Sequence, residues 1–192
     1  MVDSSEFDLW ADDYEEDVKR SDQKDEYPFA GYEEVLNFIY NKVKEKKIGK
    51  VFDVGFGTGA LTKKLYDDGY SITGIDFSPR MIEIARQKMP EARLIEWDIS
   101  NGLPEELSGE KFDFIISTYA MHHIPDPEKV AFYHILKPYL NKDGMILIGD
   151  ISFETRSQLE ACKNRTDNWD EDEFFFVHED NVQYLNFQVK RY

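Results

Sequence analysis

The sequence has a single cysteine, Cys162, among its 192 residues. One thiol forms neither an intrachain disulfide nor a cluster of thiolate metal ligands, and this composition is compatible with a reducing compartment. The sequence also has no apolar run long enough to span a bilayer, and its acidic start lacks the basic and apolar regions of a secretory signal. We therefore expect a cytoplasmic protein without a membrane partner.

Basic residues are scarce as well: 23 Lys and Arg stand against 39 Asp and Glu, for a formal net charge of −16. Such a surface repels polyanions, which argues against nucleic acid as a partner. The charge is concentrated at the ends, because residues 1–34 hold 13 acids and 3 bases while residues 165–192 hold 7 acids and 3 bases. These ends are either solvated segments or a cap over a site that prefers cations. We interpret 1–28 as an acidic lid segment and 29–192 as the binding domain.

Apolar patterning predicts strands and helices in alternation. Strands are expected at 51–54, 71–75, 92–96, 112–117 and 145–149, with helices at 29–47, after Gly59, from Pro79 and at 130–139. This order predicts an α/β fold, a Rossmann-like three-layer α/β/α sandwich with a mainly parallel sheet. Ligands bind such sheets beyond the carboxyl ends of the strands.

The C-terminal region predicts a sheet that ends with a sixth strand. Helices are expected at 155–164 and 178–186, followed by a sixth strand at 187–191, and no seventh strand follows. A sheet that ends early exposes an edge, which invites self-association. Both a monomer and a homodimer therefore remain open.

The first predicted strand leads into a glycine-rich loop, Asp53-Val54-Gly55-Phe56-Gly57-Thr58-Gly59. Glycines at alternate positions let the backbone turn tightly and approach a ligand. The second strand ends at Asp76, 21 residues after the first glycine, where a carboxylate can accept hydrogen bonds from a ribose diol. The same loop satisfies a relaxed dinucleotide fingerprint, so a nicotinamide-dependent oxidoreductase and a non-catalytic nucleotide-binding module are alternatives.

Three further features narrow the choice. An acid, Asp53, stands where dinucleotide folds usually have an apolar residue, and the third strand ends in Glu96-Trp97-Asp98. The fourth strand ends in Ser-Thr-Tyr-Ala-Met-His-His-Ile-Pro-Asp over residues 117–126. Together, FDVGFGTG, GIDFSPRM, EWD, FDFIISTYAMHHIPD and LKPYLNKDGMILIGD resemble the motifs of class I S-adenosylmethionine-dependent methyltransferases. The resemblance covers residues 6–160 and is greatest to uncharacterised bacterial small-molecule methyltransferases.

The resemblance implies S-adenosylmethionine as the cofactor and assigns roles around it. Gly55, Gly57 and Gly59 would contact the cofactor, Asp53 would orient their loop, Asp76 would bind the ribose, Asp98 and Trp97 would hold the adenine, Phe77 would stack on it, and Thr118 would line the reacting methyl. Three of these residues also have a plainer structural interpretation: Asp53 as a turn cap, Asp98 as a solvated loop acid and Phe77 as a packing residue. Transfer of the methyl group to a small-molecule acceptor by in-line displacement is the implied reaction.

A protonated acceptor needs a base, and histidine titrates near neutral pH. His123 is the first candidate and His122 the second; the alternative is that both only order their loop. Tyr14, four residues after Trp10, is either a hydrophobic clasp or a lid residue that touches the reactants.

Two weaker expectations concern the rest of the site. Glu173 and the aromatic run 174–176 are expected to line the cavity from the C-terminal side. His122, His123, His134 and Asp126 match no known ligand spacing, so no metal is expected. The sequence does not identify the acceptor, nor whether nitrogen, oxygen, sulfur or carbon is methylated.

Overall fold

The computed structural model describes residues 18, 20–23, 27, 29, 31–166 and 169–181. Five parallel strands form the central sheet in the order β3-β2-β1-β4-β5. Their bounds are Lys50–Val54 (β1), Ser71–Asp76 (β2), Arg93–Glu96 (β3), Phe112–Thr118 (β4) and Leu140–Gly149 (β5). The expected Rossmann-like α/β fold is confirmed.

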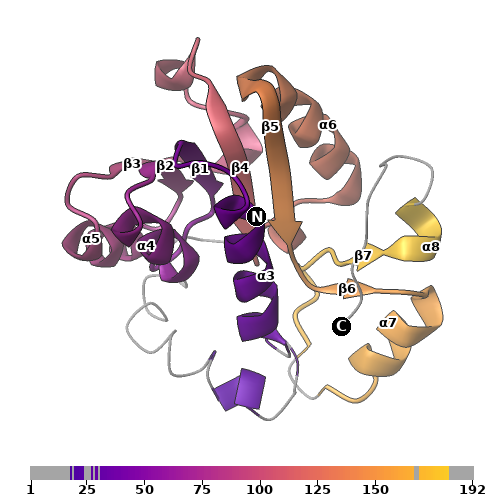
Figure 1. The fold of residues 1–192 in the computed structure, drawn as a ribbon. Coiled ribbons are helices and arrows are strands. Elements are labelled where there is room, and N and C mark those ends of the chain that lie inside the picture. Colours follow the sequence, from indigo (N-terminus) through magenta and orange to yellow (C-terminus); the bar gives the residue numbers. More distant parts are fainter. Residues whose placement is uncertain are drawn as a thin grey trace.

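Helices connect these strands and cover both faces of the sheet (Figure 1). Their bounds are Tyr32–Lys44 (α3), Ala60–Asp67 (α4), Pro79–Lys88 (α5), Asp126–Leu136 (α6), Arg156–Lys163 (α7) and His178–Asn181 (α8). Short 3-10 turns lie at Ile99–Asn101 (η1), Glu105–Leu107 (η2), Met121–His123 (η3) and Lys137–Tyr139 (η4). Ser78 caps α5 as expected, since its Oγ accepts from the backbone N–H of Met81 at 3.1 Å. No helix in the described ranges is both long and apolar enough to cross a membrane.

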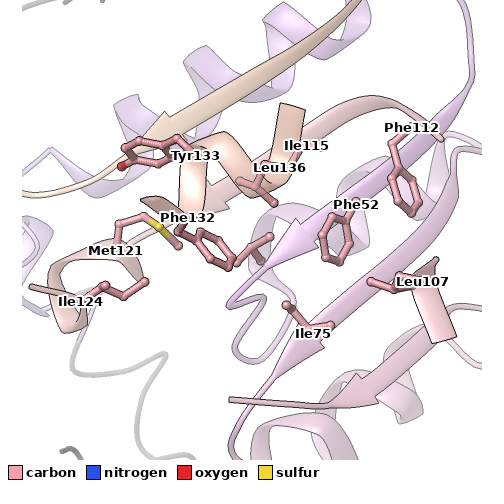
Figure 2. Close-up of a cluster of buried hydrophobic side chains, with 11 residues drawn as sticks. Phe52, Ile75, Leu107, Phe112, Ile115, Met121, Ile124, Phe132, Tyr133 and Leu136 are labelled. Carbon is pink, nitrogen blue, oxygen red and sulfur yellow. The ribbon is translucent and has the colours of Figure 1, made fainter. Parts of the chain in front are cut away.

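The core consists of two apolar layers on opposite faces of the sheet. One face packs against α3 and α4, with Leu36, Ile39, Leu61 and Leu65 among its buried residues. The other packs against α6 through Phe132, Tyr133 and Leu136, which meet Phe52, Val54 and Ile115. Figure 2 shows Met121 and Ile124 at one end of this second layer and Phe112 and Leu107 at the other. Met121 therefore anchors the turn η3, which also holds both candidate histidines, to the core.

The elements after β5 differ in part from expectation. The helix expected at 155–164 is α7, which begins with a capping box formed by Thr155 and Gln158. Ser152–Phe153 (β6) and Phe176–Val177 (β7) form a short parallel pair that the sequence pattern does not predict. The expected strand at 187–191 and the end of the expected helix at 178–186 lie outside the described residues.

Candidate functional site

A cavity of about 340 Å³ opens at the carboxyl edge of the sheet. Its size falls in the range of small-molecule sites, and its position is the one where such sheets bind ligands. The glycine loop, the ends of β2 and β4, the segment after β3, and part of the C-terminal region form its walls. The lining includes eight of the expected cofactor-binding and catalytic residues: Gly55, Gly57, Asp76, Phe77, Trp97, Asp98, Thr118 and His123.

The glycine loop approaches the cavity in a conformation that side chains disfavour. Gly55 and Gly57 have φ of 72° and 55°, both in the left-handed region. A Cβ on Gly55 would lie 2.4 Å from the Cβ of Ala120, so the loop packs directly against the turn after β4. A Cβ on Gly57 would meet no atom within 4 Å. The loop therefore leaves open space beside Gly57, as a backbone cradle for a ligand requires.

Asp76 joins this loop to the start of α5. One carboxylate oxygen accepts from the Gly57 N–H at 2.8 Å, and the other accepts from the Ser78 N–H at 3.0 Å. The carboxylate is buried at the cavity wall and held by two backbone donors from different segments. Its position is thus fixed before any ligand binds.

An apolar slot with one acid lies beside Asp76. Phe77, Trp97 and Ile99 line it, and the Trp97 ring is fixed because its Nε1 donates to the Gly102 carbonyl at 3.0 Å. Asp98 caps η1 by accepting from the Ser100 N–H at 2.8 Å. The plainer interpretation of Asp98 as a loop cap is therefore true in part, although the residue also lines the cavity.

Two of the expected cofactor-binding residues lie outside the cavity. Asp53 has its side chain on the α4 side of β1, because Phe52 and Val54 occupy the opposite face, and it accepts a hydrogen bond from Thr62 Oγ1. Gly59 is the N-cap of α4 with φ of 81°, and a Cβ there would lie 2.8 Å from Met89 Cε. Both residues therefore support the loop from behind.

The buried carboxyl of Asp53 has unusual electrostatics. Its Oδ1 has no hydrogen-bond partner among the described residues. Burial, opposed by the Thr62 hydrogen bond and assisted by the charge of Asp76, raises the pKa of Asp53 to about 7. Near neutral pH the loop therefore rests on a carboxyl that is only partly ionised.

This raised pKa predicts a pH-dependent stability. The folded carboxyl titrates near 7 and the unfolded one near 3.8, so the folded state binds the extra proton between them. The stability that Asp53 contributes is complete below about pH 4 and is lost as the pH rises to 7, by at most about 4 kcal/mol. In Asp53→Asn, the free energy of unfolding should fall less over this range. Urea titrations of both proteins at pH 4, 5.5 and 7 measure the difference; parallel curves would contradict the assignment.

The turn after β4 directs its two histidines differently. His123 lines the cavity near Thr118 and Tyr119. His122 is only 5 % exposed and is not among the residues that line the cavity. Tyr119 has φ of 52°, a strained value for a non-glycine residue, and its N–H donates to the Gly149 carbonyl at 2.8 Å. Burial and the neighbouring His122 lower the pKa of His123 to about 3. His123 therefore faces the cavity as a neutral imidazole.

His122 belongs to a buried polar network that sequence reasoning did not find. Asp150 accepts from the His122 backbone N–H at 3.0 Å and lies 2.6 Å from its Nδ1. Although burial lowers the pKa of His122, the charge and hydrogen bond of Asp150 and the charge of Glu173 together raise it. Only the position of Asp150 in the sequence could have indicated that it belongs to the site, because it directly follows β5 at the carboxyl edge of the sheet.

The C-terminal region reaches the cavity from the far side. Phe174 and Asp172 line it, as expected for Phe174, but Glu173, Phe175 and Phe176 are not among the lining residues, contrary to expectation. Instead Glu173 accepts from the Tyr27 hydroxyl at 2.7 Å, and Tyr27 stacks on Trp169 with ring centroids 5.0 Å apart. The N-terminal and C-terminal regions therefore meet beside the site. Tyr14 lies outside the described residues.

The charge of the cavity wall is of one sign. Within the described ranges, every charged side chain that lines it is acidic: Asp76, Asp98, Glu128 and Asp172. Such a wall favours a ligand with positive charge, and S-adenosylmethionine carries a sulfonium and an ammonium group. The open space at Gly57, the fixed Asp76 carboxylate and the apolar slot fit the methionine, ribose and adenine parts of that molecule.

Comparisons with known proteins agree with this geometry. A family model described as a methyltransferase domain matches residues 51–144. An uncharacterized methyltransferase of Alkaliphilus oremlandii is 32% identical over 161 residues, which cover 84% of this chain and 73% of that protein. One from Oceanobacillus iheyensis is 36% identical over 165 residues, covering 84% and 71%. The magnesium protoporphyrin IX methyltransferase of Synechocystis, solved with bound SAH, shares the fold at a TM-score of 0.62 and 18% identity, covering 81% of this chain and 72% of its own.

Proposed function

This chain belongs to the class I S-adenosylmethionine-dependent methyltransferases, and from that premise we propose that it methylates a small-molecule acceptor at the His123 end of the cavity. One observation carries the proposal. One cavity is lined both by the glycine loop and Asp76 and by His123, Tyr32 and Phe174. A methyl donor and an acceptor can therefore share one cavity.

The residues around the donor have separate roles in this proposal. Gly57 supplies the backbone cradle, Asp76 accepts from the ribose hydroxyls, and Asp98 accepts from the adenine amine beside Trp97 and Phe77. Asp53 and Gly59 act indirectly, by holding the loop and the start of α4. S-adenosylmethionine supplies an electrophilic methyl group on a sulfonium, so the protein needs chiefly to position the reactants and exclude water.

His123 and Thr118 are proposed to face the reacting groups. A neutral His123 does not repel the cationic donor, and its ring can hydrogen-bond to the acceptor. Its low pKa favours this positioning role over that of a general base. His122 holds the turn from behind through Asp150. The acidic wall favours neutral or cationic acceptors over phosphorylated or polycarboxylate ones, because anions would face Glu128 and Asp172.

Residues 1–28 are proposed to act as a lid over the acceptor end. Tyr27 supports this proposal, because it joins the N-terminal region to Glu173 and Trp169 beside the cavity. Closure by such a segment would exclude water from the transfer. Tyr14 is the residue proposed to approach the reactants.

Two measurements test the proposed function. Calorimetric titration with S-adenosylmethionine and, separately, with NADH distinguishes the methyltransferase from an oxidoreductase. Release of S-adenosylhomocysteine is then measured with amine, thiol and phenol acceptors and with their carboxylated analogues. Donor binding without release for any acceptor would favour a non-catalytic module. Faster release with the carboxylated analogues would contradict the charge argument.

His123→Asn should separate acceptor effects from donor effects. We expect kcat/KM for the acceptor to fall by about 10- to 100-fold, because one polar contact to the reacting group is lost. The Kd for S-adenosylmethionine should stay within about twofold, since the donor contacts lie elsewhere. His134→Asn, on the exposed side of α6, is the matched control. Unchanged turnover in His123→Asn would remove this residue from the reaction.

A further inference from the structure

We propose that His122, His123 and Glu173 form a binding site for a divalent transition-metal cation of the zinc type. One ligand atom from each of these residues lies within 4.8 Å of the others. Two imidazoles and one carboxylate are a known catalytic zinc donor set, in which a fourth position stays open. No ligand spacing in the sequence predicts this site, because Glu173 is 50 residues from His123.

The separation of His122 and Glu173 is the first argument. His122 Nε2 and Glu173 Oε1 lie 3.5 Å apart, which is long for a charge-assisted hydrogen bond. Two atoms bound to one tetrahedral zinc at about 2.0–2.2 Å are about 3.4 Å apart. The observed separation thus suits a shared cation better than a shared proton.

The second argument is that groups behind the cluster orient its donors. Asp150 lies 2.6 Å from His122 Nδ1, so that Nε2 is the ring atom that faces Glu173. A carboxylate behind a histidine ligand is the usual outer support of a metal site. Tyr27 donates to Glu173 Oε2 at 2.7 Å, which leaves Oε1 directed at His122. Both donors are therefore held in place without the cation.

The charges around the cluster form the third argument. The ammonium of Lys129 is paired with Asp126 at 2.9 Å. Asp150 and Glu173 lie on either side of His122, so both carboxylates would attract a cation bound between His122 and Glu173, although His122 and Lys129 already offset part of the charge of Asp150. Buried charges of one sign are costly unless they are paired or bind a metal.

The site deepens the proposed function and rests on it for its role. His123 belongs both to the cluster and to the cavity wall, so the open coordination position would face the acceptor end. A cation there lowers the pKa of an oxygen or sulfur ligand. The acceptor class inferred is therefore a hydroxyl or thiol compound, not a tertiary amine or a carbon nucleophile.

Direct binding measurements test the site without any turnover. Untagged protein is stripped with a chelator and titrated with Zn²⁺ by calorimetry and with Co²⁺ by visible absorption, in the absence of donor and acceptor. We expect one equivalent to bind, with the intense bands of tetrahedral cobalt. Absence of saturable binding would overturn the proposal and leave a proton as the occupant between His122 and Glu173. Calorimetry with S-adenosylmethionine on the same stripped protein tests the proposed function independently.

Two variants locate the bound cation. Glu173→Gln keeps the shape of the side chain and should weaken Zn²⁺ binding by at least about 10-fold, and Asp150→Asn should weaken it by about 10- to 100-fold. His134→Asn, which removes an exposed histidine outside the cluster, should bind as the wild type does. Circular dichroism shows whether each variant folds, and Glu173→Gln suffices if Asp150→Asn does not. Wild-type affinity in folded Glu173→Gln would place the cation elsewhere and overturn the proposal.

Discussion

Asp76→Asn is expected to lower the affinity for S-adenosylmethionine by at least about 100-fold. The carboxylate accepts from the N–H groups of Gly57 and Ser78, and in the proposed complex it also accepts from the ribose hydroxyls. An amide has one acceptor oxygen and one donor nitrogen, so at least one backbone donor loses its partner. Each hydrogen bond to a charged group contributes about 1.5–3 kcal/mol, and the loss of two accounts for the expected change. Calorimetric titration measures it directly.

Two further substitutions calibrate this result. Asp98→Asn should lower the affinity by only about 10-fold, because Asp98 is only partly buried and one contact to the adenine would be lost. Asp143→Asn, on an exposed stretch of β5, should change nothing. If Asp76→Asn bound the donor as tightly as Asp143→Asn does, Asp76 would have only a structural role in the loop.

Local signals account for most of the fold that the sequence predicts. A few neighbouring residues are enough to identify each of these signals, which are the apolar runs of strand length, the helix start at Ser78-Pro79 and the glycine loop. The rule that ligands bind at the carboxyl ends of parallel strands then brought Asp76, Asp98, Thr118 and His123 together. The structure places all four at one cavity.

The directions of side chains and the exact ends of helices and strands were harder to predict than the order of the elements. The resemblance placed Asp53 around the cofactor as the residue that orients the glycine loop, yet alternation along β1 turns its side chain toward Thr62 and away from the cavity. Helix α6 begins at Asp126, earlier than its apolar residues suggest, because Pro127 favours the first turn. Strand β5 begins at Leu140 and shifts register opposite Phe112, an irregularity without a sequence signal.

Contacts between distant segments had no sequence signal. Glu173 contacts Tyr27, which lies 146 residues earlier in the sequence. The acidic run that contains Glu173 is equally compatible with a solvated segment that makes no such contact. The pairing of His122 with Asp150 joins two loops that share only their place at the sheet edge. Such contacts follow from tertiary packing, so composition and spacing could narrow the candidates but not pair them.

Asp150→Ala is expected to destabilise the protein by about 3–5 kcal/mol. The Asp150 side chain is only 2 % exposed; burial raises its pKa, but His122, the Ile151 N–H and Lys129 together lower it below its usual range. Removing it leaves the His122 backbone N–H and Nδ1 without their acceptor in a place that excludes water. The loss of one partner of a buried ion pair has this magnitude. For a chain of this length it corresponds to a fall in Tm of about 6–20 °C.

The measurement is made on chelator-stripped protein, so that any bound cation does not add to the difference. Asp150→Asn should lose less than Asp150→Ala, because its amide oxygen still accepts one of the two His122 hydrogen bonds. Asp143 is an exposed acid in β5, the strand that ends just before Asp150. The free energy of unfolding of Asp143→Ala should therefore stay within about 0.5 kcal/mol of the wild-type value. In a double-mutant cycle, His122→Ala should lose little further stability once Asp150 is alanine, because the two residues act as one unit. Additive losses would show instead that the Asp150 carboxylate supports the turn after β4 only through its hydrogen bonds to backbone N–H groups, and not through the His122 ring.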